Sequence, residues 1–234
     1  MISEKFDIED FAEYTDIIDS LDGKSIILFR GQINDDPLLP KIARPNPKID
    51  TTNVEKQMLK DFKRRCGEHI QGQLHSDWDF LALAQHHGLS TRLLDWTTNP
   101  LIALWFACCS KEVKGDHSVV WAFLVPDKVL HNPDKEDSPF NTGSTKVYQP
   151  NIVGKRVANQ LGWFTTHKYS RKDNLNRFVS LEKIPNYELV KMLIPKKIRP
   201  KIIDTLNICG VNSSTIFPDL DGLCSHINAT HFGH

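Results

Sequence analysis

The chain has 234 residues, of which 40% are hydrophobic and 25% charged, and its formal net charge is zero. Such a composition is typical of a globular protein with a sizeable core, and neutrality gives no overall attraction to nucleic acid or to a membrane. Five cysteines without metal-ligand spacing, no leader-like N-terminus and no apolar run of membrane-spanning length predict a soluble cytoplasmic protein with no metal centre.

The N-terminal segment predicts a helix, a strand and a loop, in that order. Residues 7–21 place their apolar side chains roughly on one face of a short acidic helix. Residues 25–32, SIILFRGQ, predict a buried strand that ends in Arg-Gly. Four prolines make 35–50 an irregular loop. We therefore divide the chain into an acidic N-terminal helix (1–24) and a main domain (25–228).

An amphipathic helix is expected after this loop. Thr52 and Glu55 have the spacing of a capping box. Apolar residues then recur every four positions from Val54 to Ile70, which predicts that this face is buried.

Two strongly apolar helices follow. The first, at about 78–87, should end at Gly88, and the second should begin at Asn99 and Pro100 and be buried on all sides. The polar residues between them are expected to form a loop.

The C-terminal half alternates strand and helix patterns. We expect strands at 118–126, within 156–167 and at 188–195, a polar loop at 127–150, a helix stopped by Gly210 and a last short helix. The sequence therefore predicts a single α+β domain, with a small mixed or antiparallel sheet flanked by helices.

The neutral total hides a charge asymmetry. Residues 1–22 carry eight acids and one lysine, whereas 150–201 carry twelve Lys or Arg and three acids. One interpretation is that both segments are solvated faces of the protein. The other is that 150–201 forms a basic surface that binds a polyanion such as RNA or DNA.

Arg30 is the first candidate site residue, because a charge at the end of an apolar strand must be paired. Its partner is either an internal carboxylate such as Asp95, or the phosphate or carboxylate of a ligand, which a guanidinium binds with two donors. Gly31 would let such a ligand approach the backbone.

The stretch AQHHGLSTRLLDW supplies the other candidates. His86 and His87 end a helix and point about 100° apart, so one faces a site while the other caps the helix, unless both are structural. Arg92 and Asp95 either pair with each other or serve a ligand, and Asp95 could instead fix Arg30. Arg156 and Gln160 would share one face of a helical turn, which is a weak signal.

Several blocks resemble the FRG domain, a family named for its Phe-Arg-Gly motif: LFRGQ (28–32), AQHHGLSTRLLDWTTNPLIALWFA (84–107), RVANQLGWFT (156–165) and STIFPDLDGL (214–223). The resemblance runs from about 25 to 228. Such domains occur in bacteria and phages, often in genes of mobile elements and defence systems.

The chain also resembles, more weakly, the arginine-serine-glutamate ADP-ribosyltransferases, which implies a fold like theirs and NAD as substrate. Phe29-Arg30-Gly31, Ser90-Thr91-Arg92, ALWFA and VVWAFLVP appear in the order of that family's blocks. The sequence departs from the pattern at the third block, where no Q-x-E or E-x-E occurs. Gln160 comes closest to the catalytic glutamate, with Glu182 and Asp219 as alternatives.

This second resemblance assigns roles to the candidates. The implied catalytic residues are Arg30, His87, Thr91 and Gln160. The implied NAD-binding residues are Arg30, Gly31, Gln32, His86, Ser90, Thr91, Arg92, Asp95 and Arg156. In that family the arginine holds the phosphates or ribose, and the Ser-Thr segment orients the nicotinamide ribose.

Two hypotheses about function follow. The first is an NAD-dependent ADP-ribosyltransferase that acts as a toxin or defence effector, with nucleic acid (RNA or DNA) bound by the basic 150–201 surface as a candidate target. The second is a non-catalytic module that binds a nucleotide or phosphate in a phage-defence or toxin–antitoxin system. Either could have an antitoxin protein as partner, and a different hydrolase or nuclease activity remains a third alternative.

Overall fold

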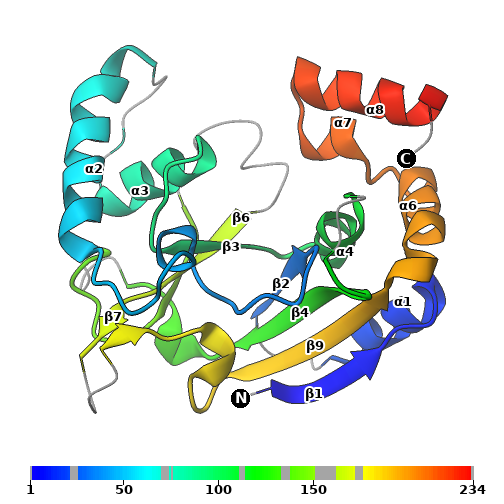
Figure 1. Cartoon of the computed structure of the whole chain (residues 1–234), viewed down its shortest axis with the longest axis horizontal. Coiled ribbons are helices and arrows are strands. Elements are labelled where there is room, and N and C mark those ends of the chain that lie inside the picture. The colour runs from blue at the N-terminus through cyan, green and yellow to red at the C-terminus, as the bar shows by residue number, and fades with distance from the viewer. Residues whose placement is uncertain are drawn as a thin grey trace.

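The computed structural model describes most of the chain. The described residues are 2–21, 26–69, 74, 76–110, 114–132, 138–150, 162–171 and 176–232. They form a single α+β domain, as the sequence predicts, in which helices flank one large sheet (Figure 1). None of the helices in these ranges is long and apolar enough to span a bilayer.

The main sheet is mixed. Its strands, in spatial order, are β1 (Ile2–Asp7), β9 (Glu188–Pro195), β4 (His117–Val125), β2 (Ile26–Gln32), β3 (Leu93–Thr97), β6 (Gly162–Thr166) and β5 (Lys146–Tyr148). The pair β1–β9 is parallel, and the other neighbours are antiparallel. A separate hairpin pairs β7 (Tyr169–Ser170) with β8 (Arg177–Phe178).

The helices lie in three groups. The first group packs beside strands β2, β4 and β9 and consists of α1 (Phe11–Ser20), α4 (Pro100–Cys108) and α6 (Arg199–Ile208). At the other end of the molecule stand α2 (Thr52–Arg65) and α3 (Asp77–His86), and the C-terminal pair is α7 (Ser213–Ile216) and α8 (Leu220–Phe232) (Figure 1). Short 3-10 turns are Lys41–Ala43, Cys66–His69, Asp127–Val129, Leu181–Lys183 and Lys196–Ile198.

Both faces of the central strands are buried. Alternation along β4 sends Val120 and Ala122 into the core beneath α1, α4 and α6, and sends Val119, Trp121 and Phe123 into a second core on the opposite face. A strand covered on both sides has no need of polar positions, which is why this segment is a nearly continuous apolar run.

The local signals for three helices are confirmed. The side chain of Asn99 caps α4 by accepting hydrogen bonds from the first-turn amides. Gly88 and Gly210 follow the ends of α3 and α6 with φ of 93° and 78°, a left-handed conformation that favours glycine.

The sequence analysis missed three strands of the main sheet, β1, β3 and β5, and both strands of the β7–β8 hairpin. The most important is β3, because residues 93–97 were expected to lie in a loop. This segment pairs residue by residue with β6 and joins β2 where Phe29 faces Thr97. Strand alternation sets Asp95 on the opposite face from Leu94 and Trp96, which are buried in the second core.

The predicted capping box of α2 is wrong, and its predicted buried face is confirmed only in part, since Cys66 is buried. The side chain of the N-cap residue Thr51 makes no capping bond, Asp50 Oδ1 accepts from the Thr52 amide instead, and the Glu55 carboxylate bonds Arg92. Val54 is 59% exposed, whereas Glu55 and Leu59 are buried, so the buried face is displaced by one residue. The displacement follows from the distant arginine, which draws the acid inward.

The N-terminal segment contributes to the same core as the rest of the chain. Strand β1 pairs with β9, and Tyr14 on α1 donates a hydrogen bond to the carbonyl oxygen of Pro100 at 2.7 Å. The division at residue 24 remains a prediction.

Candidate functional site

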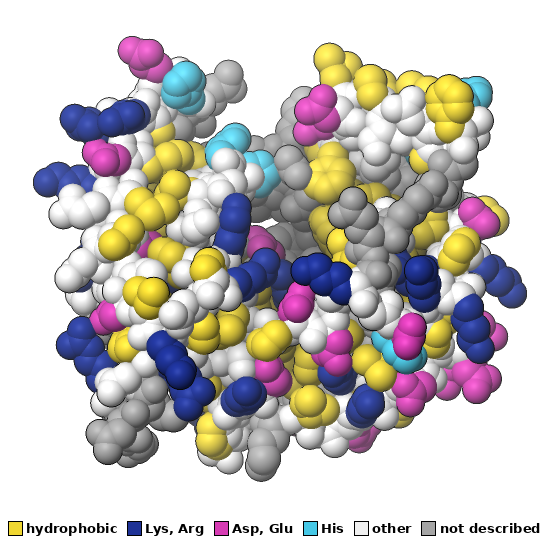
Figure 2. All heavy atoms as spheres, viewed as in Figure 1, with side chains coloured by type: hydrophobic (Ala, Val, Ile, Leu, Met, Phe, Trp, Pro, Cys, Tyr) yellow, Lys and Arg dark blue, Asp and Glu magenta, His cyan; other side chains and the backbone are white. Residues whose placement is uncertain are grey.

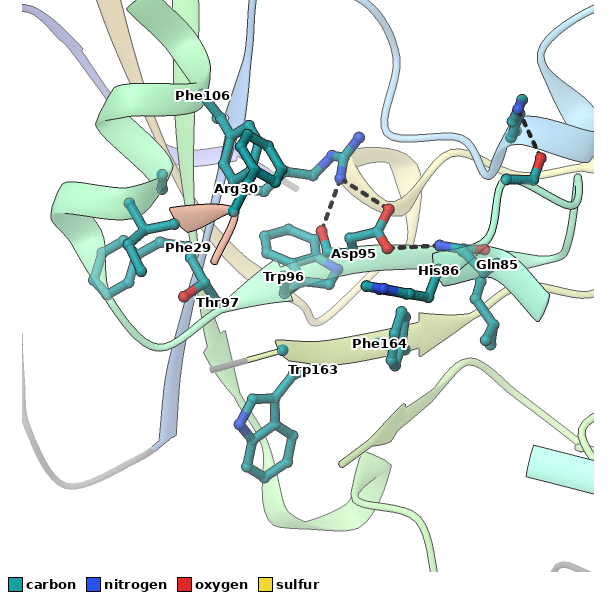
Figure 3. Close-up of a pocket in the computed structure, with 18 of the residues that line it drawn as sticks. Phe29, Arg30, Gln85, His86, Asp95, Trp96, Thr97, Phe106, Trp163 and Phe164 are labelled. Carbon is teal, nitrogen blue, oxygen red and sulfur yellow. Dashed lines mark hydrogen bonds and ion pairs between the residues drawn. The ribbon is translucent and has the colours of Figure 1, made fainter. Parts of the chain in front are cut away.

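A cavity of about 400 Å³ opens where the ends of β2 and β3 meet α3 and α4. Figure 2 shows it as a hollow bordered by basic and histidine side chains. Its polar side chains are Arg30, Lys41, Arg44, Gln85, His86, Asp95 and Thr97. Its aromatic side chains are Phe29, Trp96, Phe106, Trp163, Phe164 and Phe217. The segment after α3 forms a wall of the cavity that faces Arg30 (Figure 3).

Arg30 lies at the inner end of this cavity and is held on one side by β3. Its Nη1 donates to the carbonyl oxygen of Asp95 at 2.8 Å and lies 3.8 Å from the Asp95 carboxylate (Figure 3). Burial and the neighbouring Arg44 lower the pKa of Arg30 to about 10, so it stays charged at neutral pH. Its buried Nε has no partner among the described residues.

Asp95 is fixed by a chain of hydrogen bonds that leads into the core. Gln85 Nε2 donates to Asp95 Oδ1 at 2.8 Å, and the Thr91 hydroxyl donates to Gln85 Oε1. The Thr91 bond fixes which end of the Gln85 amide faces Asp95. The prediction that Asp95 positions an arginine is confirmed, and that arginine is Arg30.

The two histidines divide as the helix geometry predicts. His86 lines the cavity, whereas His87 is the exposed C-cap residue of α3 (Figure 3). Their rings are 5.0 Å apart and perpendicular. His87, assigned above to catalysis, does not line the cavity, and His86 has the better position for contact with a ligand.

Arg92 belongs to the core and does not line the cavity. It is 1% exposed, and its Nε donates to Glu55 at 2.8 Å while its backbone N–H donates to the same carboxylate at 2.6 Å. Burial raises the pKa of Glu55, and the charge of Arg92 opposes that rise. The suggested pair of Arg92 with Asp95 does not form, because each has another partner.

Other candidates also have structural environments. Thr91 is fully buried and accepts a hydrogen bond from the Leu93 amide, besides its bond to Gln85. A Cβ on Gly31 would lie 1.9 Å from the carbonyl oxygen of Ala103, so this glycine admits helix α4. Neither Gln32 nor half-buried Ser90 lines the cavity.

None of the side chains suggested above for the role of the catalytic glutamate is placed in the cavity by the described residues. Arg156 and Gln160 lie outside the described residues. The alternatives Glu182 and Asp219 accept hydrogen bonds from the amides of Leu38 and Gly222, away from the cavity. Among the acids in the described part of the chain, Asp95 alone lines it.

Sequence reasoning missed two cations of the site. Lys41 and Arg44 come from the proline-rich loop and line the cavity beside Arg30. Lys41 Nζ donates to the Gly88 carbonyl oxygen at 3.0 Å, and Arg44 Nε donates to that of Leu39 at 3.1 Å. A lysine and an arginine in an irregular loop carry no signal of a site, and only the fold brings them to β2.

The basic stretch 150–201 does not form one surface in its described part. Arg171 pairs with Asp50, and Lys191 pairs with Asp35. Arg199 is buried and donates to backbone carbonyl groups of residues 108 and 110. Figure 1 shows β7 and α6, which carry or adjoin these cations, at opposite sides of the molecule.

The fold and site define an α+β protein with one cationic, aromatic-walled cavity. No three His, Cys, Asp or Glu side chains in the described ranges are grouped as metal ligands would be. Residues 25–116 match the family model of the FRG domain, and the chain therefore carries an FRG domain. The match contains most of the cavity, while Trp163, Phe164 and Phe217 lie beyond it. No curated protein and no solved structure shows significant similarity to the chain.

Proposed function

We propose that the FRG-domain cavity binds a nucleotide through its phosphates. The observation that carries this proposal is the grouping of Arg30, Lys41 and Arg44 in one cavity whose only acid among the described residues, Asp95, is already bonded to Arg30. The cavity keeps a net positive charge without a ligand. Its volume of about 400 Å³ lies in the usual range for small-molecule sites, about 300–1,000 Å³.

The two kinds of wall suit the two ends of a nucleotide. A guanidinium binds a phosphate through two parallel hydrogen bonds, and Asp95 holds that of Arg30 in place before a ligand arrives. Phe106, Trp163 and Phe217 offer aromatic surface for a base, since stacking tolerates any base.

Calorimetric titration with AMP, ADP, NAD and adenosine tests the proposal. We expect the phosphorylated ligands to bind at least about tenfold more tightly than adenosine, a difference of about 1.4 kcal/mol. Arg30→Lys should bind weakly, because lysine lacks the planar fork. Lys197→Ala is the matched control, since this exposed residue lies outside the cavity. Equal affinity for adenosine, or full binding by Arg30→Ala, would refute the proposal.

A second candidate function is ADP-ribosyl transfer from NAD, and the position of Asp95 favours it. The bond between nicotinamide and C1′ of the ribose breaks with its electron pair on nicotinamide, and an acceptor atom bonds to C1′ and loses its proton. A carboxylate accepts about four hydrogen bonds, so Asp95 can bind a ribose hydroxyl besides Gln85 and Arg30. Its charge would also stabilise the oxocarbenium-like transition state.

Release of free nicotinamide from NAD tests this second candidate. Asp95→Asn should lose at least about a hundredfold in rate, as expected for loss of a transition-state charge contact, while NAD still binds. The presence of RNA, DNA or cell lysate separates a transferase from a glycohydrolase. If the wild-type protein binds NAD and no nicotinamide appears with any acceptor, the cavity is a recognition site only.

Because the chain matches the FRG family model and such domains occur in genes of mobile elements and defence systems, we propose that it acts as a toxin or defence effector, held in check by an antitoxin protein. Expression in bacteria tests it, because wild-type protein should slow growth and Arg30→Ala, at equal abundance, should not. If wild-type and Arg30→Ala proteins slow growth equally, the toxicity does not depend on the cavity.

A further inference from the structure

We infer that a basic tract continuous with the cavity binds the backbone of a single-stranded nucleic acid, whose terminal nucleotide occupies the cavity. The inference rests on the proposed nucleotide binding and names its substrate class. The basic tract consists of Lys41, Arg44, Lys48, Arg171 and Arg177. It differs from the predicted 150–201 surface, because three of its members come from the proline-rich loop and only Arg171 and Arg177 from that stretch.

Packing makes the tract one surface. The Tyr169 hydroxyl on β7 donates to the carbonyl oxygen of Lys48 at 2.9 Å, and the Phe178 amide on β8 donates to that of Pro47 at 2.8 Å. Beneath them, Phe178 shares a small apolar core with Leu39 and Ala43. The β7–β8 hairpin is therefore fixed against the loop that carries Lys41 and Arg44 into the cavity.

The surface is strongly positive. Residues 38–50, 168–171 and 176–178 contain six Lys or Arg and one acid, Asp50. Asp50 pairs with Arg171, whose side chain nevertheless stays 77% exposed. In Figure 2, Lys and Arg side chains continue from the hollow toward the side of the molecule where Figure 1 shows β7.

The combination of tract and cavity selects the class of partner. Lys41 and Arg44 belong to both, so an anion in the cavity can continue along the tract. A row of cations matches a polyphosphate backbone, and the aromatic cavity fits one base that is out of a stack. A paired base would have to leave its duplex first, which costs free energy, and the geometry therefore favours a single strand.

Fluorescence anisotropy with labelled DNA and RNA single strands of about ten nucleotides tests the inference. If about five phosphates are contacted, a plot of the logarithm of the affinity against the logarithm of the salt concentration should have a slope of about −3.5. The affinity should then fall roughly 100-fold between about 50 and 200 mM salt. Duplex of the same sequence should bind more weakly.

Charge reversal at the far end separates the tract from the cavity. Lys48→Glu with Arg177→Glu should weaken the binding of the oligonucleotide by at least about tenfold, reduce the salt slope by about 1.4 and leave the affinity for ADP unchanged. Both residues lie outside the cavity, and neither forms a core contact. Lys196→Glu with Lys197→Glu is the matched control, with the same charge change on the 3-10 turn before α6.

The outcomes are distinguishable. If the wild-type protein binds ADP but binds no oligonucleotide at low salt, the inference is wrong and the proposed function stands. The same conclusion follows if the Lys48/Arg177 variant binds the oligonucleotide as tightly as the wild type. Oligonucleotide binding that needs the tract, without any binding of ADP, supports the tract and refutes the free-nucleotide proposal.

Discussion

Gly31 shows how a single residue in a recognisable motif can have a packing role. An added Cβ would lie 1.9 Å from the Ala103 carbonyl oxygen and 2.7 Å from the Ala107 nitrogen, and both atoms belong to a helix backbone that cannot move locally. The glycine after Arg30 therefore lets α4 lie directly on β2, which fixes the distance between the arginine and the helical wall of the cavity.

Gly31→Ala should lower the free energy of unfolding by about 3 kcal/mol, the upper part of the range for overpacking a core. Urea titration measures this loss. Gly67→Ala is the control, because no atom lies within 4 Å of its added Cβ, and it should change stability by less than about 0.5 kcal/mol. A Gly31→Ala protein as stable as the wild type would show that α4 can shift.

His167 illustrates a buried titratable group behind the site. Trp96 Nε1 donates to the Thr165 hydroxyl at 3.0 Å, and that hydroxyl lies at hydrogen-bond distance, 3.1 Å, from His167 Nε2. Burial, with the charges of Arg30 and Arg92 adding to it, lowers the pKa of His167 to about 4.

This pKa predicts acid sensitivity. The folded-state pKa of about 4 lies below the ordinary 6.5, so the unfolded chain binds the proton more readily, and stability is lost as pH falls from about 6.5 to about 4. The contribution of this one group is about 3 kcal/mol. Urea titrations across this range should show the fall in wild type and in the exposed-site control His87→Gln, but a smaller fall in His167→Leu. An equal fall in all three would assign it to other groups.

At the scale of elements, one buried ion pair ties α2 to β3. Glu55 is fully buried, and it accepts both the backbone and the guanidinium hydrogen bonds of Arg92. Arg92 also lies over the ring of Phe140 at 4.5 Å. Because β3 carries Asp95, this pair fixes the strand that holds Arg30.

Glu55→Ala should cost about 3–5 kcal/mol, since it leaves a buried guanidinium without its partner. Chemical unfolding measures the loss. The double variant Glu55→Met with Arg92→Met should regain much of the lost free energy of unfolding, because two apolar side chains leave no uncompensated buried charge. A loss below about 1 kcal/mol in Glu55→Ala would mean that Arg92 finds another partner or water.

At the scale of the whole molecule, the C-terminal helix is one of the most exposed elements of the fold. Only Gly222 of α8 is buried, while its apolar Leu220, Leu223, Ile227 and Phe232 are exposed. The preceding segment is joined to the core by Ile216, which is 1% exposed, and by Phe217, whose ring packs edge-on against Trp105 and Phe106. The exposed helix α8 therefore follows directly after an aromatic wall of the cavity.

Hydrogen exchange should reveal this difference. Amides of α8 should exchange at least about a hundredfold faster than those in the middle of β4, because local opening of α8 exposes little apolar surface. Helix α6 is the control, since four of its residues are buried, and it should exchange more slowly than α8. Protection of α8 equal to that of β4 would show that the pair α7–α8 opens only with the whole domain.

The sequence by itself determined those elements whose signals are local. Strand 26–32, helices α3, α4 and α6 and their ends follow from apolar runs, the Asn99 cap and the glycines at 88 and 210. The single α+β domain and the FRG match follow from the same segments. Each signal acts within a few residues, so it needs no knowledge of the fold.

The tertiary structure alone decided the partners. Residues 93–97 became a strand because β2 and β6 supply its hydrogen bonds from distant parts of the chain. Glu55 became an ion-pair residue because the fold places it next to Arg92, which is 37 positions away in sequence. Lys41 and Phe217 joined the cavity for the same reason. A buried charge or strand edge must be paired, but its partner is chosen by proximity in space, which a local sequence pattern does not encode.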